Sequence, residues 1–220
     1  MMNAIKAIIF DLDGTLINSA PDIQFASNAA LRTINRDPLD IETIISFIGN
    51  GSEVLVDRFV EFTGGGSETL KRKVFTTFMN VYEENVTTLT KPYPGVIDAL
   101  SGFKARGIKL GICTNKPNDL ANKICVNLDI AKYFDVICGS VANKPKKPDP
   151  YLLKSCVNAM ECNLDEIAYV GDSTIDFDTA MNASINFYLF SGGYLNRPYP
   201  NFHKCIQFND WKNININYNS

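Results

Sequence analysis

Two aspartates, Asp11 and Asp13, directly follow the apolar residues 7–10 near the start of the chain. Such an apolar run is typical of a buried strand, and open α/β sheets bind their ligands beyond the carboxyl ends of the strands. Two carboxylates at that place repel each other unless a cation lies between them. A hard divalent ion such as Mg²⁺ prefers oxygen ligands and commonly accompanies phosphate groups. The pair therefore predicts a magnesium site that faces a phosphorylated ligand.

Two further groups of polar side chains could bind a phosphoryl group. Thr114 and Asn115 follow the apolar residues 108–113, and a hydroxyl and an amide at a strand end can donate hydrogen bonds to phosphoryl oxygens. Lys147 stands among the lysines and prolines of residues 144–150, ahead of an expected helix, where an ammonium can anchor a dianion. Each pattern alone also has an ordinary explanation, as a cap, a turn or a solvated run of charge.

A second pair of aspartates, Asp172 and Asp176, follows the apolar residues 167–170. Four residues apart, with a helix expected between them, they should lie on one face of the first helical turn. A helix cap explains one aspartate at such a place, but it does not explain two. The repetition of acid at a strand end therefore strengthens the interpretation as a metal site.

The elements that position these groups form an α/β pattern. From residue 107 onward, short apolar runs alternate with helical spacing, which predicts βαβ units and a mostly parallel sheet. Strands are expected at residues 5–10, 108–113, 135–138, 167–170 and 185–190, and helices from near Pro117 and Pro148. Whether residues 205–211 add an edge strand or only pack against the core stays open.

The first two expected strands are separated by about 97 residues, which is far more than a crossover helix needs. Residues 21–88 have helical spacing, interrupted by glycines at 49–51 and 64–66. We therefore expect an α/β core made of residues 1–17 and 92–220, with a small all-α domain inserted at residues 18–91. The two crossing segments would form a hinge.

The composition narrows the class of protein. A net charge of −3 and an isoelectric point near 5.2 give no basic field that would favour nucleic acid. No segment approaches a membrane span, and six cysteines without a CxxC pair favour a reduced, cytoplasmic protein. The single histidine, His203, disfavours a serine or cysteine hydrolase. We expect a small-molecule partner and either a monomer or a homodimer.

Taken in order, residues 11–16, 114–115, 147 and 171–176 resemble the motifs of the haloacid dehalogenase superfamily of phosphohydrolases, a resemblance that spans residues 5–190. The helical insertion is similar to the cap of that superfamily. Residues 92–96 and 114–117 are most similar to its phosphoglycolate phosphatase branch. The resemblance implies a Rossmann-type α/β core with a helical cap, and Mg²⁺-dependent hydrolysis of a small phosphorylated metabolite, with 2-phosphoglycolate as the first choice.

The resemblance also implies roles for the acidic residues. Asp11 would be the nucleophile that forms a phosphoaspartate, and Asp13 would act as general acid and base. The side chains of Asp11 and Asp172, with the backbone carbonyl of Asp13, would hold Mg²⁺. Asp176 and Ser173 would support the metal site from the following helix turn.

The remaining implied roles concern substrate. Thr114 and Lys147 would hold the transferring phosphoryl group and neutralise the charge that develops on it, with Asn115 beside them. Gly49 and Asn50 are similar to the loop by which the branch contacts its substrate.

Several functions remain open at this point. The substrate of a phosphatase could instead be a sugar phosphate, a nucleotide or pyrophosphate, and a phosphoglucomutase-like phosphotransferase would use the same core. A non-catalytic module that binds a phosphorylated ligand is the alternative from another class. The cap would select the leaving group, with Arg32, Asn50 and Arg58 as candidate contacts.

Overall fold

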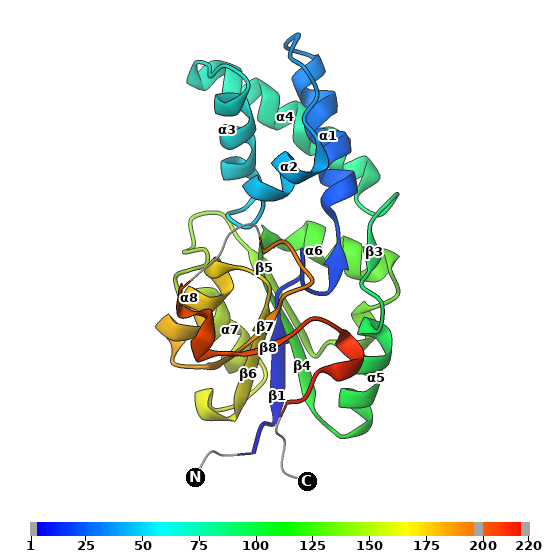
Figure 1. Cartoon of the computed structure of the whole chain (residues 1–220), viewed down its shortest axis with the longest axis vertical. Coiled ribbons are helices and arrows are strands. Elements are labelled where there is room, and N and C mark those ends of the chain that lie inside the picture. Colours follow the sequence, from blue (N-terminus) through cyan, green and yellow to red (C-terminus); the bar gives the residue numbers. More distant parts are fainter. Residues whose placement is uncertain (1–3, 196–199, 217–220) are drawn as a thin grey trace.

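Six parallel strands form the main sheet of the computed structural model, which describes residues 4–195 and 200–216 (Figure 1). Their order across the sheet is β5-β4-β1-β6-β7-β8, and each strand is parallel to its neighbours. The strands are β1 (Ala7–Phe10), β4 (Lys109–Pro117), β5 (Val136–Ser140), β6 (Ile167–Gly171), β7 (Asn186–Phe190) and β8 (Ile206–Phe208). The predicted parallel α/β sheet is therefore confirmed.

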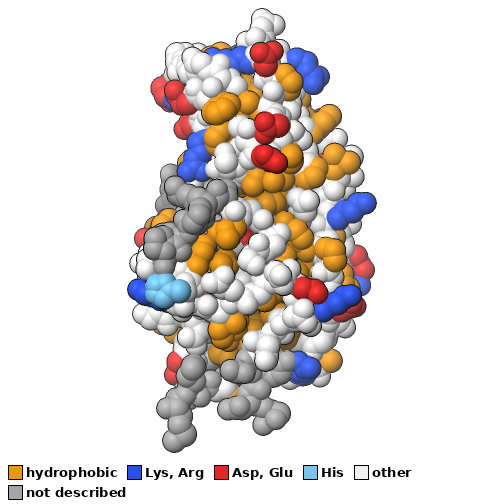
Figure 2. Space-filling view, viewed as in Figure 1, with side chains coloured by type: hydrophobic (Ala, Val, Ile, Leu, Met, Phe, Trp, Pro, Cys, Tyr) orange, Lys and Arg blue, Asp and Glu red, His pale blue; other side chains and the backbone are white. Residues whose placement is uncertain are grey.

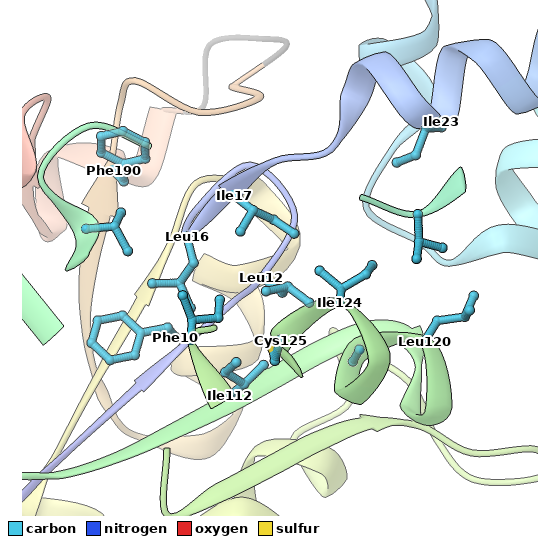
Figure 3. Packing of buried hydrophobic residues seen from close by; sticks show 14 of the residues in the cluster. Phe10, Leu12, Leu16, Ile17, Ile23, Ile112, Leu120, Ile124, Cys125 and Phe190 are labelled. Atoms are coloured by element: carbon cyan, nitrogen blue, oxygen red, sulfur yellow. The ribbon is translucent and has the colours of Figure 1, made fainter. Parts of the chain in front are cut away.

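Alternating residues of β1 pack on opposite faces of this sheet. Ile8 and Phe10 belong to the apolar cluster that also includes residues of α5 (Val96–Ala105) and α6 (Asn118–Asn127), part of which is drawn in Figure 3. Ala7 and Ile9 belong to a second cluster, formed with α7 (Tyr151–Ala159) and α8 (Thr174–Ala183). Burial on both faces explains why β1 is a continuous apolar run.

Four helices lie beyond the carboxyl edge of the sheet, above the ends of the strands in Figure 1. They are α1 (Ala20–Arg32), α2 (Ile41–Phe47), α3 (Ser52–Phe62) and α4 (Glu68–Asn85). The chain enters and leaves them through β2 (Ile17–Asn18) and β3 (Lys91–Pro92), which pair antiparallel. The apolar cluster of the core continues into these helices, so the boundary at residues 18–91 remains a prediction.

Residues 205–211 both add an edge strand and pack against the core, the two alternatives that the sequence left open. β8 adds an edge strand beside β7, and Trp211 in the 3-10 turn η4 (Trp211–Asn213) is buried. The Trp211 ring lies 5.9 Å from that of Phe10 and 5.5 Å from that of Phe190, measured between centroids. The segment therefore covers one side of the sheet as well as extending it.

Some predicted boundaries are wrong. β1 begins at Ala7, two residues later than expected, and β5 continues to Ser140. β4 does not end at Cys113 but continues through polar residues to Pro117, with an irregular register against β5. α7 begins only at Tyr151, whose backbone N–H donates to Asp149 Oδ1 at 2.8 Å. A pattern of apolar residues cannot predict that the polar residues at the end of β4 are buried, so the predicted strand was too short.

The surface carries charges of both signs. On the face drawn in Figure 2, acidic and basic side chains are interspersed, and the exposed His203 of the 3-10 turn η3 (Pro200–Lys204) lies on this face. Within the residues described, no helix is long and apolar enough to span a bilayer.

A single buried carboxylate ties α1 to the segment that returns to the core. Asp22, in the first turn of α1, accepts hydrogen bonds from the backbone N–H groups of Leu89 and Thr90 at 2.9 and 2.8 Å. It also accepts one from Thr90 Oγ1 at 2.6 Å. Asp22 is 1% exposed, so loss of its carboxylate would leave these buried donors without an acceptor.

We expect Asp22→Ala to lower the free energy of unfolding by about 2–4 kcal/mol, because hydrogen bonds to a charged group are lost and donors stay buried. Urea denaturation would measure this change. Asp57→Ala, on the exposed side of α3, is the matched control and should change it by less than about 0.5 kcal/mol. Equal effects of the two variants would contradict the role given to Asp22.

Candidate active site

The loop after β1 folds tightly back toward β6. Asp11 continues the sheet, because its backbone N–H donates to Val170 O at 2.8 Å. Gly14 then adopts a φ of +87°, and a Cβ at that residue would lie 2.4 Å from Asp172 Oδ2. Thr15 Oγ1 donates to Asp172 Oδ1 at 2.6 Å. The glycine thus lets the first loop reach the aspartate that follows β6.

Three buried carboxylates meet at this edge of the sheet. Asp11, Asp172 and Asp176 each place an oxygen atom within 4.8 Å of the others. Burial raises the pKa of Asp11 to about 7, against the effect of Lys147. Burial and the charges of Asp176 and Asp11 raise the pKa of Asp172 well above its usual range. Three anions this close favour a cation between them.

The donor set fits a divalent metal ion. Among the residues described, Asp11 Oδ1 is buried without a hydrogen-bond donor, although Lys147 Nζ lies 2.8 Å away as an ion pair. An oxygen-only set of carboxylates is what hard cations such as Mg²⁺ select. Asp11 and Asp172 could hold the ion, with Asp176 beside them.

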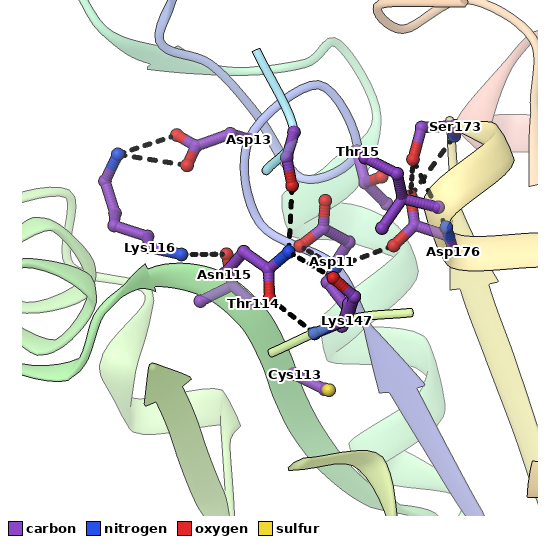
Figure 4. A network of polar contacts seen from close by, with 12 residues as sticks. Asp11, Asp13, Thr15, Cys113, Thr114, Asn115, Lys116, Lys147, Ser173 and Asp176 are labelled. Atoms are coloured by element: carbon purple, nitrogen blue, oxygen red, sulfur yellow. Dashed lines mark hydrogen bonds and ion pairs between the residues drawn. The ribbon is translucent and has the colours of Figure 1, made fainter. Parts of the chain in front are cut away.

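Lys147 and Asp176 form a buried ion pair behind Asp11 (Figure 4). Lys147 Nζ lies 2.6 Å from Asp176 Oδ1 and donates to Tyr169 Oη at 3.1 Å. Burial would raise the pKa of Asp176, but Lys147 and the hydrogen bonds from Ser173 and Tyr169 outweigh it and lower that pKa. Burial opposes the charge of Lys147, yet Asp11 and Asp176 raise its pKa, so the ammonium stays charged. Asp176 thus orients the lysine.

The prediction that Asp172 and Asp176 share the first turn of a helix is wrong for Asp172. α8 begins at Thr174, and Ser173 is its N-cap. Ser173 Oγ accepts from the backbone N–H of Asp176 at 3.3 Å, and Asp176 Oδ2 accepts from the backbone N–H of Ser173 at 3.2 Å, which together form a capping box. Ser173 Oγ also donates to Asp176 Oδ2 at 2.5 Å. Asp172 precedes the cap, in the turn that leaves β6, and reaches the cluster from there.

Thr114 and Asn115 lie in the extension of β4 rather than after it. Thr114 is buried and lines the same cavity as Asp11, and its role as a phosphoryl ligand stays a prediction. The Asn115 amide is occupied by backbone groups: Nδ2 donates to Gly49 O and Lys147 O, both at 3.0 Å, and Oδ1 accepts from Lys147 N. Asn115 therefore ties the Lys147 segment to the helical insertion.

Two cavities open beside the carboxylates. Asp11, Asp13 and Gly49 line both of them, and Asn50 lines only the larger, which has a volume of about 620 Å³. Asn50 Oδ1 accepts from Arg58 Nη2 at 2.7 Å. Of the three candidate contacts in the insertion, Arg58 also lines the larger cavity, whereas Arg32 lines neither.

The structure separates the two aspartates of the first motif. The Asp13 carboxylate points away from the three clustered carboxylates and toward Lys116. Lys116 Nζ lies 3.0 Å from each Asp13 carboxylate oxygen. Ser19 Oγ also donates to Asp13, at 2.5 Å, and Tyr82 Oη accepts from Lys116 at 2.7 Å. Sequence reasoning missed these partners. The position of Lys116 directly after two predicted site residues was the available signal.

The comparisons with known proteins agree with this geometry. Residues 8–190 match the family described as haloacid dehalogenase-like hydrolase. A phosphoglycolate phosphatase of Cereibacter sphaeroides is 38% identical over 192 residues, which cover 87% of each chain. One of Rhodobacter capsulatus is 34% identical over 206 residues, which cover 93% of each chain.

Solved structures point the same way. The crystal structure of a predicted phosphoglycolate phosphatase from Haemophilus somnus 129PT superposes with a TM-score of 0.89, at 29% identity and covering 96% of each chain. The chain belongs to the haloacid dehalogenase-like hydrolase family. The resemblance that the motifs predict is therefore confirmed.

We expect a divalent cation to stabilise the protein, and to do so more at about pH 8 than at about pH 5. The raised pKa of Asp11, about 7, means that the metal-free protein loses stability as the pH rises through that value and this buried group ionises. Near saturation, added Mg²⁺ should raise the melting temperature by about 5–10 °C at the higher pH.

Differential scanning fluorimetry would measure these shifts. Asp172→Asn should lose most of the shift, because it removes one carboxylate charge at nearly unchanged volume. A cation shift that is the same at both pH values and survives in Asp172→Asn would contradict this assignment of the site.

Proposed function

We propose that this protein is a Mg²⁺-dependent phosphate-monoester hydrolase that acts through a phosphoaspartate on Asp11, with 2-phosphoglycolate as its substrate. One observation carries the proposal: the buried carboxylate of Asp11 belongs to the cluster of three carboxylates, and its Oδ1 lies 2.8 Å from the ammonium of Lys147. Such a carboxylate can contribute one oxygen to a metal ion and attack phosphorus with the other, beside a cation that can bind the phosphoryl oxygens.

The charge of each group at the site determines its proposed role toward the phosphoryl group. Lys147, held by Asp176 and Tyr169, would bind the transferring phosphoryl group together with Thr114. Asp11 would attack phosphorus in line with the leaving oxygen. Bound Mg²⁺, held by Asp11, Asp172 and the backbone carbonyl of Asp13, would neutralise charge on the phosphoryl oxygens.

Asp13 is proposed as the general acid and base. Its carboxylate points away from the other carboxylates, toward Lys116. It could therefore transfer a proton to the leaving oxygen while Asp11 attacks phosphorus. It lines the smaller cavity together with Tyr82 of α4. Asp13 lines both cavities, but only the smaller one is also lined by Tyr82 and Lys116, and we place the leaving group there.

The lining of that cavity supports a small leaving group. Its walls include the apolar side chains Ile23, Leu55 and Phe78. A sugar ring would bury several hydroxyl groups against these walls without hydrogen-bond partners, which costs free energy. Glycolate adds only one methylene and one carboxylate beyond the leaving oxygen.

The helical insertion is proposed to act as a cap on the core. Residues 18–91 would close over residues 1–17 and 92–220 about the β2 and β3 connections, which lie side by side. Closure would exclude water from the phosphoryl group. The proposed compartment is the cytoplasm, where reducing conditions would keep the six thiols unpaired.

We expect Asp11→Asn to lower kcat on 2-phosphoglycolate by at least about 10⁴-fold, because the amide is not a nucleophile for phosphorus. A phosphate-release assay with Mg²⁺ would measure it, with Asp57→Asn as an exposed control of the same chemistry and near-normal activity. Full activity of Asp11→Asn would overturn the mechanism.

A panel of monoesters tests the substrate separately. We expect kcat/KM for 2-phosphoglycolate to exceed that for a hexose 6-phosphate by about 100-fold or more, because the hydroxyl groups of the hexose would be buried against the apolar walls of the smaller cavity. If the hexose phosphate were the better substrate, the choice of phosphoglycolate would fall while the phosphoaspartate mechanism stood. Tight binding without hydrolysis of any monoester would instead favour a binding module.

A further inference from the structure

Lys116 is the only lysine or arginine among the described residues that line the smaller cavity. It comes from the polar extension of β4, next to Thr114 and Asn115, and its side chain is 4% exposed. A buried ammonium costs free energy unless it is paired, so its presence needs an explanation. The phosphoryl end of the site already has its own buried cation, Lys147.

We propose that Lys116, together with Tyr82, recognises a carboxylate on the leaving group and so determines the preference of the enzyme for an acidic monoester. This inference rests on the proposed function, because it assigns the residues that would distinguish 2-phosphoglycolate from neutral monoesters of similar size.

The hydrogen bonds of Lys116 leave room for such a ligand. Its Nζ lies 3.0 Å from both oxygens of Asp13 and 2.7 Å from Tyr82 Oη. An ammonium has three donors, so a second carboxylate can replace one of the two Asp13 contacts while the other remains. Because Tyr82 Oη accepts from Lys116, its own hydrogen can be donated to the same carboxylate.

The surroundings make this charge selective. Ile23, Leu55 and Phe78 form apolar walls, so water competes little for the ammonium there. Burial opposes the charge of Lys116, but Asp13 and Tyr82 raise its pKa, so it remains a cation at neutral pH. A charged hydrogen bond in such a place is stronger than in water, and a neutral leaving group cannot use it.

The two buried lysines also match the charges of the proposed substrate. Lys147 contacts Asp11, and Lys116 contacts Asp13, so each of the two first-motif aspartates has its own ammonium. 2-Phosphoglycolate carries a phosphoryl dianion at one end and a carboxylate at the other. The arrangement thus presents one cation to each end of a molecule with two anionic ends.

Tyr82 extends this recognition to the helical insertion. It lies on α4, whereas Lys116 lies on β4 of the core, and the Tyr82 ring stacks on Phe78 with centroids 5.5 Å apart. A carboxylate held by both residues would bridge the insertion and the core. The leaving group itself would therefore favour the closed arrangement of the two parts.

The test compares 2-phosphoglycolate with 2-hydroxyethyl phosphate, which replaces the carboxylate by a neutral hydroxymethyl group. We expect the wild-type protein to prefer 2-phosphoglycolate in kcat/KM, and Lys116→Met to reduce the ratio of the two values by about 10- to 100-fold. Tyr82→Phe should reduce the ratio in the same direction by a smaller factor. Lys146→Met is the matched control, because Lys146 is a half-buried lysine near Gly51 that is paired with Glu53 and lines neither cavity, and it should leave the ratio unchanged.

The ratio separates recognition from support of Asp13. If Lys116 only positioned Asp13, Lys116→Met would slow both substrates equally, and an unchanged ratio would overturn the inference while the proposed function stood. If the wild-type protein did not prefer 2-phosphoglycolate, the inference and the choice of 2-phosphoglycolate as substrate would fall, while the phosphoaspartate mechanism stood. Should Lys116→Met fail to fold, as judged by circular dichroism, the Tyr82→Phe ratio and competitive inhibition of the wild type decide the matter. Glycolate should then inhibit at least about 10-fold better than ethylene glycol, and equal inhibition would overturn the inference.

Discussion

The repulsion among three buried carboxylates is the constraint on which this structure depends. Parallel pairing of β1 with β6 sets Phe10 beside Val170, so Asp11 and the turn that carries Asp172 must leave the sheet next to each other. Asp176 joins them from α8, within 4.8 Å. Protonation or nearby positive charge relieves this repulsion, and the protein supplies part of the positive charge through Lys147. The rest defines the place of a metal ion.

The loops around this cluster hold its charged side chains in place. Gly14 gives the first loop the close approach that Thr15 needs to reach Asp172, and Asn115 fixes the backbone of Lys147 with two hydrogen bonds. These contacts come from segments far apart in the sequence that meet at one edge of the sheet. These contacts bury polar groups, which would cost free energy if the groups had no partners. Hydrogen bonds and ion pairs among the buried groups offset that cost.

Much of the fold follows from hydrophobic spacing alone, because periodicity records which side of an element is buried. Helices α2 and α3 occur where glycine breaks and apolar spacing predict them. The extension of β4 through Thr114 and Lys116 was not predictable, because polar residues give no apolar signal when they are buried among one another. Nor could spacing reveal that Lys116 meets Asp13, since that contact joins residues 103 positions apart and depends on side-chain direction. Motif spacing selected aspartates that lie near one another in the structure. Only the three-dimensional arrangement shows that Asp11 joins the cluster of carboxylates whereas Asp13 pairs with Lys116.

Tyr194 connects two places that are otherwise described separately. Its backbone N–H donates to Asp172 Oδ2 at 2.7 Å, while its hydroxyl accepts from Ala20 N at 2.7 Å and donates to Asn18 Oδ1 at 2.9 Å. Tyr194 thus makes hydrogen bonds both to Asp172, in the carboxylate cluster, and to the first residue of α1. A rotation of the helices about this connection must either break the hydroxyl contacts or carry the Tyr194 backbone with it. Movement at the proposed hinge and charge at the carboxylate cluster would therefore be coupled through a single residue, and by reciprocity each would act on the other.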